Sequence, residues 1–197
     1  MIIGVAGKID SGKSLVCSIL RNIADQYGKR VEIKSFAYPI YRIVSDLTDI
    51  SIEEIKRRKK NHVTVQVKDQ VTNYRSIMQT IGNGLREYGH DDIWIDSLFG
   101  VDNQEAIREL TWKTDWWIIE DLRYTNEAKR IKSLSGYVFQ VVRDESENNS
   151  HVAENSLSAW SEWDLIINNN YKTVDEAKAE IHKELDDFVK EVLYGWI

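Results

Sequence analysis

Residues 2–14 constrain the fold of this chain more than any other segment. An apolar run, Ile2–Ala6, leads into the sequence GKIDSGKS over Gly7–Ser14, and residues of helical period follow. A glycine, four residues and then Gly-Lys-Ser make the Walker A pattern, which here stands between a predicted strand and a predicted helix. Glycines let such a loop curl until several backbone N–H groups point at one anion, and the helix N-terminus adds a positive field. We call Gly7–Ser14 the phosphate loop and expect it to bind the triphosphate of a nucleotide.

Individual residues of the phosphate loop have predicted roles. The Lys13 ammonium is expected to reach the β- and γ-phosphates, and the Ser14 hydroxyl to be a ligand of Mg²⁺, so ATP and Mg²⁺ are the predicted cofactors. The predicted nucleotide contacts are Gly7, Asp10, Ser11, Gly12, Lys13, Ser14 and Leu15. An incidental glycine-rich turn is the structural alternative, and the strand before the loop and the helix after it disfavour that alternative.

Short apolar runs alternate with segments of helical period along the rest of the chain, which is typical of βαβ units around a mostly parallel sheet. Strands are predicted at Ile2–Ala6, Val31–Phe36, Asp115–Glu120, Tyr137–Val142 and Asp164–Asn168. Helices are predicted at Lys13–Tyr27, Ile40–Leu47, Ile52–Lys60, 74–88, Asn126–Leu134 and beyond Thr173, where Thr173 and Glu176 form a capping box. The sequence therefore predicts an α/β fold with about five mostly parallel strands flanked by helices.

Length, charge and cysteine content narrow the class of protein. The 197 residues suit a single domain over 1–197. The net charge of −6 lacks the basic field that binding to a nucleic-acid polymer requires, so no such partner is expected. The sequence contains no stretch of 18 consecutive apolar residues, so no membrane-spanning helix is expected. Cys17 is the single cysteine, which excludes an intramolecular disulfide and favours a reducing cytoplasm.

A second group of charged residues follows the predicted strand that ends at Glu120. Asp121 would then lie at the carboxyl edge of the sheet, where open α/β sheets bind ligands. It is a candidate to hold the Mg²⁺ shell or to orient the acceptor, and a helix-capping aspartate is the alternative. Arg123 lies two residues further on and could clamp a phosphate with its planar guanidinium, whereas a surface ion pair is the alternative.

Other basic residues have weaker signals. Arg75 and Arg86 lie on the predicted helix at 74–88, where isolated arginines are as well explained by solvation as by binding. The run Lys56–Lys60 reads as a solvated helix face, with attraction of anionic nucleotides as its second interpretation.

Several segments, in order along nearly the whole chain, resemble the phage-type deoxynucleoside monophosphate kinases, a branch of the P-loop kinases. These segments are GKIDSGKS, the Phe36-Ala37-Tyr38-Pro39 turn, YRSIMQTIGNGLREYGHDDIWIDSLF at 74–99, IIEDLRYTNEA at 118–128, Val142-Arg143, His151-Val152-Ala153-Glu154, and DLIINN at 164–169. The phosphate loop is the most specific of them. The resemblance implies a three-layer P-loop NTPase fold of the nucleoside monophosphate kinase type.

The same resemblance implies a phosphotransferase that moves the γ-phosphoryl group of ATP to a deoxynucleoside monophosphate (dNMP). It implies catalytic roles for Lys13, Asp121 and Arg123, and substrate contacts at Arg75, Gln79, Arg86, Trp94, Asn126, Glu127 and Arg143. The helical region at about 37–100 is expected to bind the acceptor, and the polar segment at about 143–156 is a candidate lid. A second copy of the chain is a candidate partner. A viral origin, which the resemblance also implies, would place the protein in the host cytoplasm.

The chain departs from that family at Asn83, Glu120 and Ala153, where threonine, a small polar residue and serine are expected. These changes bear most on the identity of the acceptor. Two other functions fit the phosphate loop: a P-loop kinase for another small molecule, such as a coenzyme precursor, and a nucleotide-gated regulator or motor ATPase. The response of ADP release to different acceptors separates all three.

Overall fold

The computed structural model describes residues 1–67, 70–144 and 156–195. Its contacts divide the chain into two compact units. The first, which we call the sheet unit, consists of Met1–Ser35 and Gln104–Ile197. The second, the helical unit, is Phe36–Asn103, close to the region at 37–100 in which acceptor binding is expected. Each unit is described by itself.

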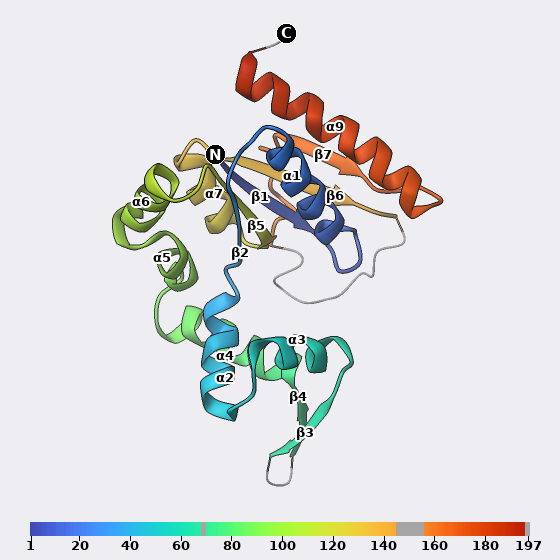
Figure 1. Ribbon diagram of the computed structural model, residues 1–197. Helices are drawn as coiled ribbons and strands as arrows, with labels where there is room; N and C mark the ends of the chain where they lie inside the picture. Colours follow the sequence, from blue (N-terminus) through green and yellow to red (C-terminus); the bar gives the residue numbers. More distant parts are fainter. Residues whose placement is uncertain (68–69, 145–155, 196–197) are drawn as a thin grey trace. The chain divides into compact units, whose positions relative to one another are not determined.

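The sheet unit contains a five-stranded parallel sheet (Figure 1). Its strands are β1 (Ile2–Gly7), β2 (Val31–Lys34), β5 (Trp116–Leu122), β6 (Tyr137–Val142) and β7 (Leu165–Asn168). They lie in the order β2-β5-β1-β6-β7, and every neighbouring pair is parallel. β1 is therefore central, and helices cover both faces of the sheet, which explains why the inner strands β1, β5 and β6 are mostly apolar, whereas the edge strand β2 alternates apolar residues with Glu32 and Lys34. The predicted α/β fold with five parallel strands is confirmed.

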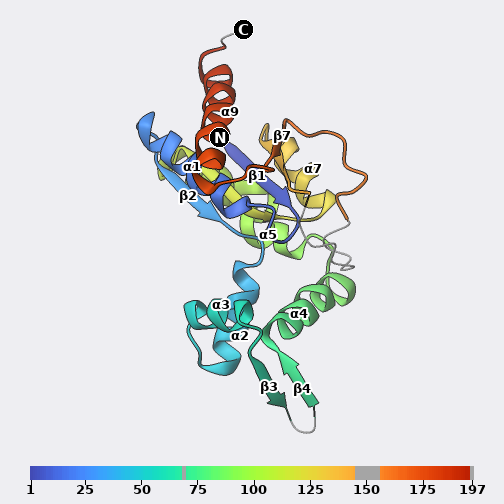
Figure 2. The same ribbon diagram turned by 90° about the vertical axis from the view of Figure 1, so that its right-hand side faces the viewer.

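Helices α1 (Lys13–Gln26) and α9 (Val174–Tyr194) lie on one face of the sheet, and α7 (Thr125–Ser133) lies on the other (Figure 2). The main core forms where α1 and α9 meet the sheet. It includes Leu20 and Ile23 of α1, Ile181 and Leu185 of α9, and Ile118 of β5, all fully buried. The α/β/α layering thus follows from the apolar stripes of these helices.

The opposite face depends on a close approach of helix to strand. A β-carbon added at Gly4 of β1 would lie 2.5 Å from Cδ1 of Ile131 in α7. Gly4 therefore lets α7 pack directly on the central strand. The sheet unit also contains α6 (Gln104–Trp112), which the sequence analysis missed.

The long helix α9 begins as predicted at Thr173. The Thr173 hydroxyl accepts a hydrogen bond from the Glu176 N–H at 3.1 Å, which is half of a capping box. The carboxylate of Glu176 accepts from the N–H of Lys172 at 3.2 Å, one residue before the position that a capping box would use.

None of the helices in the described part of the chain has both the length and the apolar composition of a membrane-spanning segment.

The helical unit contains four α-helices, a short 3-10 turn and a hairpin. Their bounds are α2 (Tyr38–Thr48), α3 (Ile52–Lys60), β3 (Thr64–Val67), β4 (Gln70–Asn73), α4 (Tyr74–Tyr88), α5 (Ile93–Phe99) and η1 (Val101–Asn103). Helices α2, α3 and α4 were predicted to within a few residues. The hairpin was missed, because the sequence between β3 and β4 carries no Asn-Gly or similar turn signal. Helix α5 was missed as well.

Candidate active site

The phosphate loop connects the central strand β1 to helix α1, as the sequence predicts. Gly12 is the N-cap of α1 and has φ +102°, while Gly7 has φ +154°. A β-carbon at Gly7 would lie 2.6 Å from the carbonyl oxygen of Val141 in β6, and one at Gly12 would lie 2.2 Å from Nδ2 of Asn169. Both positions therefore exclude any side chain. Asp10 also has a positive φ, 60°, which aspartate tolerates better than most residues.

The Lys13 side chain folds back over its own loop. Its ammonium donates to the carbonyl oxygens of Gly7 and Lys8, at 2.6 and 2.5 Å. These contacts place a positive charge at the mouth of the loop, next to the N-terminus of α1. Ser14 is exposed at the second position of α1, and Leu15 is half-buried beside it.

The loop also contains a buried polar atom that fits an anion. Ser11 is 1% exposed, and within the described part of the chain its hydroxyl has no hydrogen-bond partner. A buried hydroxyl without a partner costs stability, and a phosphate oxygen is a good acceptor for it. Together with the two positions where only glycine fits and the positive end of α1, Ser11 makes the loop suitable for a polyphosphate.

Asp121 lies near the carboxyl end of β5, the strand between β1 and β2. Its Oδ2 accepts a hydrogen bond from the Ser35 hydroxyl at 2.7 Å, immediately after β2. The helix that follows β5 has Tyr124 as its N-cap and Glu127 as its capping carboxylate. The alternative interpretation of Asp121 as a helix cap is therefore wrong.

The backbone of Arg123 is held on both sides. Its N–H, and that of Tyr124, donate to Oε2 of Glu127 at 2.9 and 3.0 Å. Its carbonyl accepts a hydrogen bond from the Ser156 hydroxyl. Glu127 is 1% exposed, so these contacts give it a positioning role at the turn, whereas its predicted contact with the acceptor stays a prediction. Asn126 accepts the N–H of Glu127 at 3.1 Å.

The Arg123 side chain itself is half-buried. It forms no ion pair with any residue for which the structure gives a position, so the alternative of a surface ion pair has no support there. Arg143 is exposed just after β6. Most of the candidate lid at 143–156 lies outside the described residues, which include only Arg143, Asp144 and Ser156 of that segment.

In the helical unit, Arg75 and Gln79 lie one turn apart on α4 and both are half-buried. The Nε of Arg75 is buried and has no hydrogen-bond partner within the described residues. Arg86 donates to the carbonyl of Asp91 at 3.2 Å. Trp94 is 3% exposed and its indole N–H donates to the Gly82 carbonyl at 3.1 Å. That burial favours a core role for Trp94 over the base stacking that the sequence suggested.

The basic run on α3 is engaged locally. Arg57 and Arg58 pair with Glu54 at 2.7 and 2.6 Å, and these guanidinium groups lower the pKa of Glu54 to about 2. The ammonium groups of Lys56 and Lys59 lie 5.6 and 5.2 Å from the centre of the Tyr41 ring. These contacts favour a solvated helix face held by local ion pairs and aromatic contacts.

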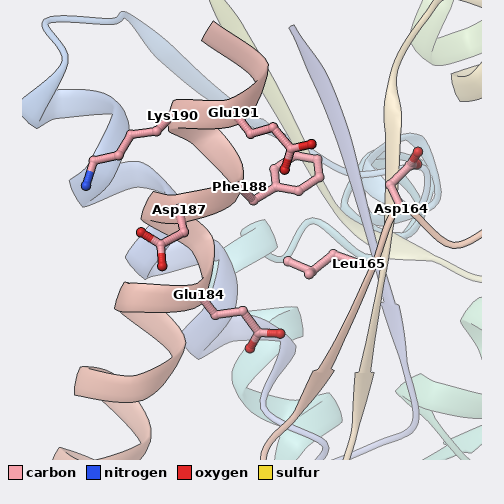
Figure 3. Close-up of a pocket in the computed structure, with 7 residues that line it drawn as sticks. All are labelled: Asp164, Leu165, Glu184, Asp187, Phe188, Lys190 and Glu191. Carbon is pink, nitrogen blue, oxygen red and sulfur yellow. The ribbon is translucent and has the colours of Figure 1, made fainter. Parts of the chain in front are cut away.

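A separate pocket of about 550 Å³ lies between α9 and the start of β7 (Figure 3). Glu184 and Glu191 extend from α9 toward the strands, whereas the Asp164 carboxylate points away from α9 (Figure 3) and pairs with the Lys132 ammonium of α7 at 2.7 Å. Burial raises the pKa of the Glu184 carboxyl. The pocket lies at the amino end of β7, whereas the phosphate loop lies at the carboxyl end of β1. Its acidic lining would repel a nucleotide phosphate, so we assign it no part in the site.

Three residues that contact the site were not predicted from the sequence. Asn169 donates to the Ser11 carbonyl, Ser35 contacts Asp121 and Ser156 contacts Arg123. Asn169 belongs to the DLIINN segment, so a signal was present for it. Ser35 and Ser156 lie far from their partners in the sequence, and no local pattern indicates either contact.

Comparison with known proteins gives a sequence similarity along nearly the full length of the chain. No protein-family model matches the chain. A protein of Acanthamoeba polyphaga mimivirus, named "Putative deoxynucleotide monophosphate kinase", is 28% identical over 193 residues, which cover 95% of this chain and 97% of that protein. This similarity confirms the resemblance that the ordered motifs indicated and, at the level of enzyme class, the expectation of a phosphotransferase.

Solved structures give a more distant likeness. Shikimate kinase from Aquifex aeolicus has a TM-score of 0.40 and 15% identity, covering 96% of this chain and 98% of that chain. Cobyrinic acid a,c-diamide synthase from Mycobacterium smegmatis with bound ADP and magnesium has a TM-score of 0.41 and 12% identity, covering 94% and 80%. The fold of this chain is therefore assigned from its own strand order and phosphate loop.

Proposed function

We propose that this protein transfers the γ-phosphoryl group of ATP to a deoxynucleoside monophosphate, giving the diphosphate and ADP. The observation that carries the proposal is the phosphate loop at the end of the central strand, in a chain similar over nearly its whole length to a protein named as a deoxynucleotide monophosphate kinase. Phosphoryl transfer requires positioned groups that neutralise charge on the phosphate oxygens, rather than a covalent nucleophile. The charged and hydroxyl groups described above are of that kind.

The sheet unit would bind ATP and Mg²⁺. Backbone N–H groups of the phosphate loop and the Lys13 ammonium would hold the phosphates, and the Ser14 hydroxyl would be a ligand of Mg²⁺. Asp121, fixed by Ser35, would orient the shell of that ion or the acceptor. Bound Mg²⁺ neutralises phosphate charge, and water molecules and phosphate oxygens usually supply most of its ligands. One hydroxyl and one carboxylate from the protein therefore suffice to hold it.

Arg123 is proposed to stabilise the charge on the transferred group. Its backbone is fixed by Glu127 and Ser156, and among the described residues no carboxylate pairs with its guanidinium. In related systems such an arginine contributes about 10³–10⁵ in rate. Acceptor contacts are proposed for Arg75, Gln79 and Arg86 of the helical unit, and for Asn126, Glu127 and Arg143.

The test is ADP release with MgATP across a panel of deoxynucleoside and ribonucleoside monophosphates. We expect at least one dNMP to stimulate release strongly, Lys13→Ala to abolish it, and Arg123→Ala to lose roughly 10³-fold in turnover or more while the fold survives. Lys129→Ala, an exposed charge on α7, is the control.

Two rival functions predict different results in that assay. Stimulation only by a non-nucleotide acceptor would indicate the coenzyme-precursor type of kinase. Stimulation only by a protein or a nucleic acid would indicate a regulator or motor. Either outcome would refute the transfer to dNMP, while the binding of MgATP could still be measured directly.

A further inference from the structure

Asn169 makes a contact between two segments that are far apart in the sequence. It follows β7 directly, is 7% exposed, and its side-chain Nδ2 donates to the carbonyl oxygen of Ser11 at 2.8 Å. Its own N–H donates to the Val142 carbonyl at 2.8 Å, which fixes its backbone to the end of β6. The side chain of Asn169 therefore reaches the phosphate loop from a rigid position.

The geometry of the peptide bond makes this contact relevant to phosphate binding. The Ser11–Gly12 peptide is planar and trans, so its carbonyl and the N–H of Gly12 point in opposite directions. The carbonyl points at Asn169, and the Gly12 N–H must consequently point away from it. Gly12 is the N-cap of α1, where N–H groups lack helical partners and are available to an anion.

The approach is close enough to fix the peptide. A β-carbon at Gly12 would lie 2.2 Å from Nδ2 of Asn169, so the amide group packs against the glycine backbone itself. Gly12 has φ +102°, and a glycine without restraint can adopt several backbone conformations at low cost. A buried hydrogen bond that selects one of them preorganises the loop before the nucleotide arrives.

We propose that Asn169 is a positioning residue that sets the orientation of the Ser11–Gly12 peptide and so aims the Gly12 N–H at the nucleotide phosphates. The inference rests on the proposed binding of nucleotide at the phosphate loop. Asn169 should therefore affect the affinity for ATP and leave the affinity for the acceptor nearly unchanged.

The experiment compares Asn169→Ala and Asn169→Asp with the wild type. Asn169→Asp keeps the size of the side chain and replaces the donor with an oxygen that faces the Ser11 carbonyl. Asn168→Ala is the matched control, because Asn168 is the adjacent residue of the same type and is exposed. For each protein the Kd of MgATP is measured by calorimetry, KM and kcat are measured for MgATP and for the dNMP, and thermal unfolding is recorded.

We expect Asn169→Ala to raise the Kd and the KM of MgATP about three- to tenfold, the loss of one hydrogen bond. Asn169→Asp should raise them further, since its negative charge also repels phosphate. The KM of the dNMP should change less than about twofold by the same reasoning, and Asn168→Ala should behave as the wild type. A merely structural role would lower the melting temperature without this separation of the two KM values.

Failure of this inference and failure of the proposed function are distinguishable. If the wild type binds MgATP and the two Asn169 variants bind it equally well, the positioning role is overturned and the kinase proposal stands. If the wild type binds MgATP but accepts no dNMP, the kinase proposal falls and the calorimetric comparison still decides the role of Asn169. If the alanine variant does not fold, the aspartate variant, which keeps the side-chain volume, decides the matter. If the wild type binds no MgATP, both are overturned.

Discussion

Removing the Glu127 carboxylate should weaken both the fold of the sheet unit and the placement of Arg123. Glu127 is 1% exposed, and its Oε2 accepts the N–H groups of Arg123 and Tyr124 at 2.9 and 3.0 Å. Glu127→Ala removes the acceptor of both hydrogen bonds and half of the capping box at the start of α7. Glu127→Gln keeps a carbonyl oxygen at nearly the same place but removes the charge.

The magnitude follows from the number and kind of bonds lost. A hydrogen bond to a charged group contributes about 1.5–3 kcal/mol, and the two N–H groups belong to half-buried residues, so water recovers part of that loss. We therefore expect Glu127→Ala to lower the free energy of unfolding by about 2–4 kcal/mol. For a chain of this size that corresponds to a fall of roughly 5–15 °C in melting temperature. Glu127→Gln should cost about half as much.

Chemical denaturation gives the free energy of unfolding, and ADP release under saturating substrates gives the turnover. Both variants should have lower turnover, and Glu127→Ala should lose more than Glu127→Gln, because the alanine variant leaves the Arg123 backbone less fixed. Lys129→Ala, on the exposed side of the same helix, is the control for α7. A Glu127→Ala protein within about 0.5 kcal/mol of the wild type, the range of neutral surface changes, would refute the assignment of these hydrogen bonds to stability.

Three further predictions concern residues of the sheet unit. Burial raises the pKa of the Cys17 thiol to about 12. The neutral thiol therefore contributes fully to the free energy of unfolding below about pH 8.5, the usual thiol pKa, and this contribution is lost as pH rises through the folded value. A thiol reagent at pH 8 should react with Cys17 only after denaturation. Leu185→Ala, at a fully buried position of α9, should lower the free energy of unfolding by about 2–5 kcal/mol, whereas Val174→Ala, at a position 65% exposed, should cost far less; urea titration measures both. Ser156→Ala removes the hydroxyl that donates to the Arg123 carbonyl and should lower turnover several-fold with the KM of ATP unchanged, and an equal rise in that KM would contradict its placement.

The fold was predictable where local pattern and burial agree. The three inner strands of the sheet, β1, β5 and β6, are mostly apolar runs with both faces covered, so each was visible without a partner strand in view. The phosphate loop was predictable for the same reason, since its glycines and its flanking strand and helix are contiguous. The order of the strands required the structure, because β5 lies between β1 and β2 although more than 80 residues separate it from β2.

Sequence patterns could not supply contacts that depend on distant segments. The place of Glu127 in a motif suggested that it contacts the acceptor. Its burial and its two backbone partners show that it positions the turn at Arg123. Trp94 stood among motif residues that suggested stacking, yet the structure buries it. The hairpin at 64–73 was missed because its two strands have only four residues each and the sequence between them contains no glycine.

The phosphate loop has the residues of a nucleotide site in its own sequence, but its conformation is imposed by later parts of the chain. The Val141 carbonyl excludes a side chain at Gly7, and Asn169 fixes the carbonyl of Ser11. Both constraints come from segments much later in the sequence: Val141 lies in β6, which pairs with β1, and Asn169 follows β7. A fragment that ends before β6 would keep the GKIDSGKS motif and lose the contacts that restrain the loop, because two glycines without these contacts have many backbone conformations available. The proposed polyphosphate site therefore depends on the completed sheet, to which the motif contributes the residues that permit it.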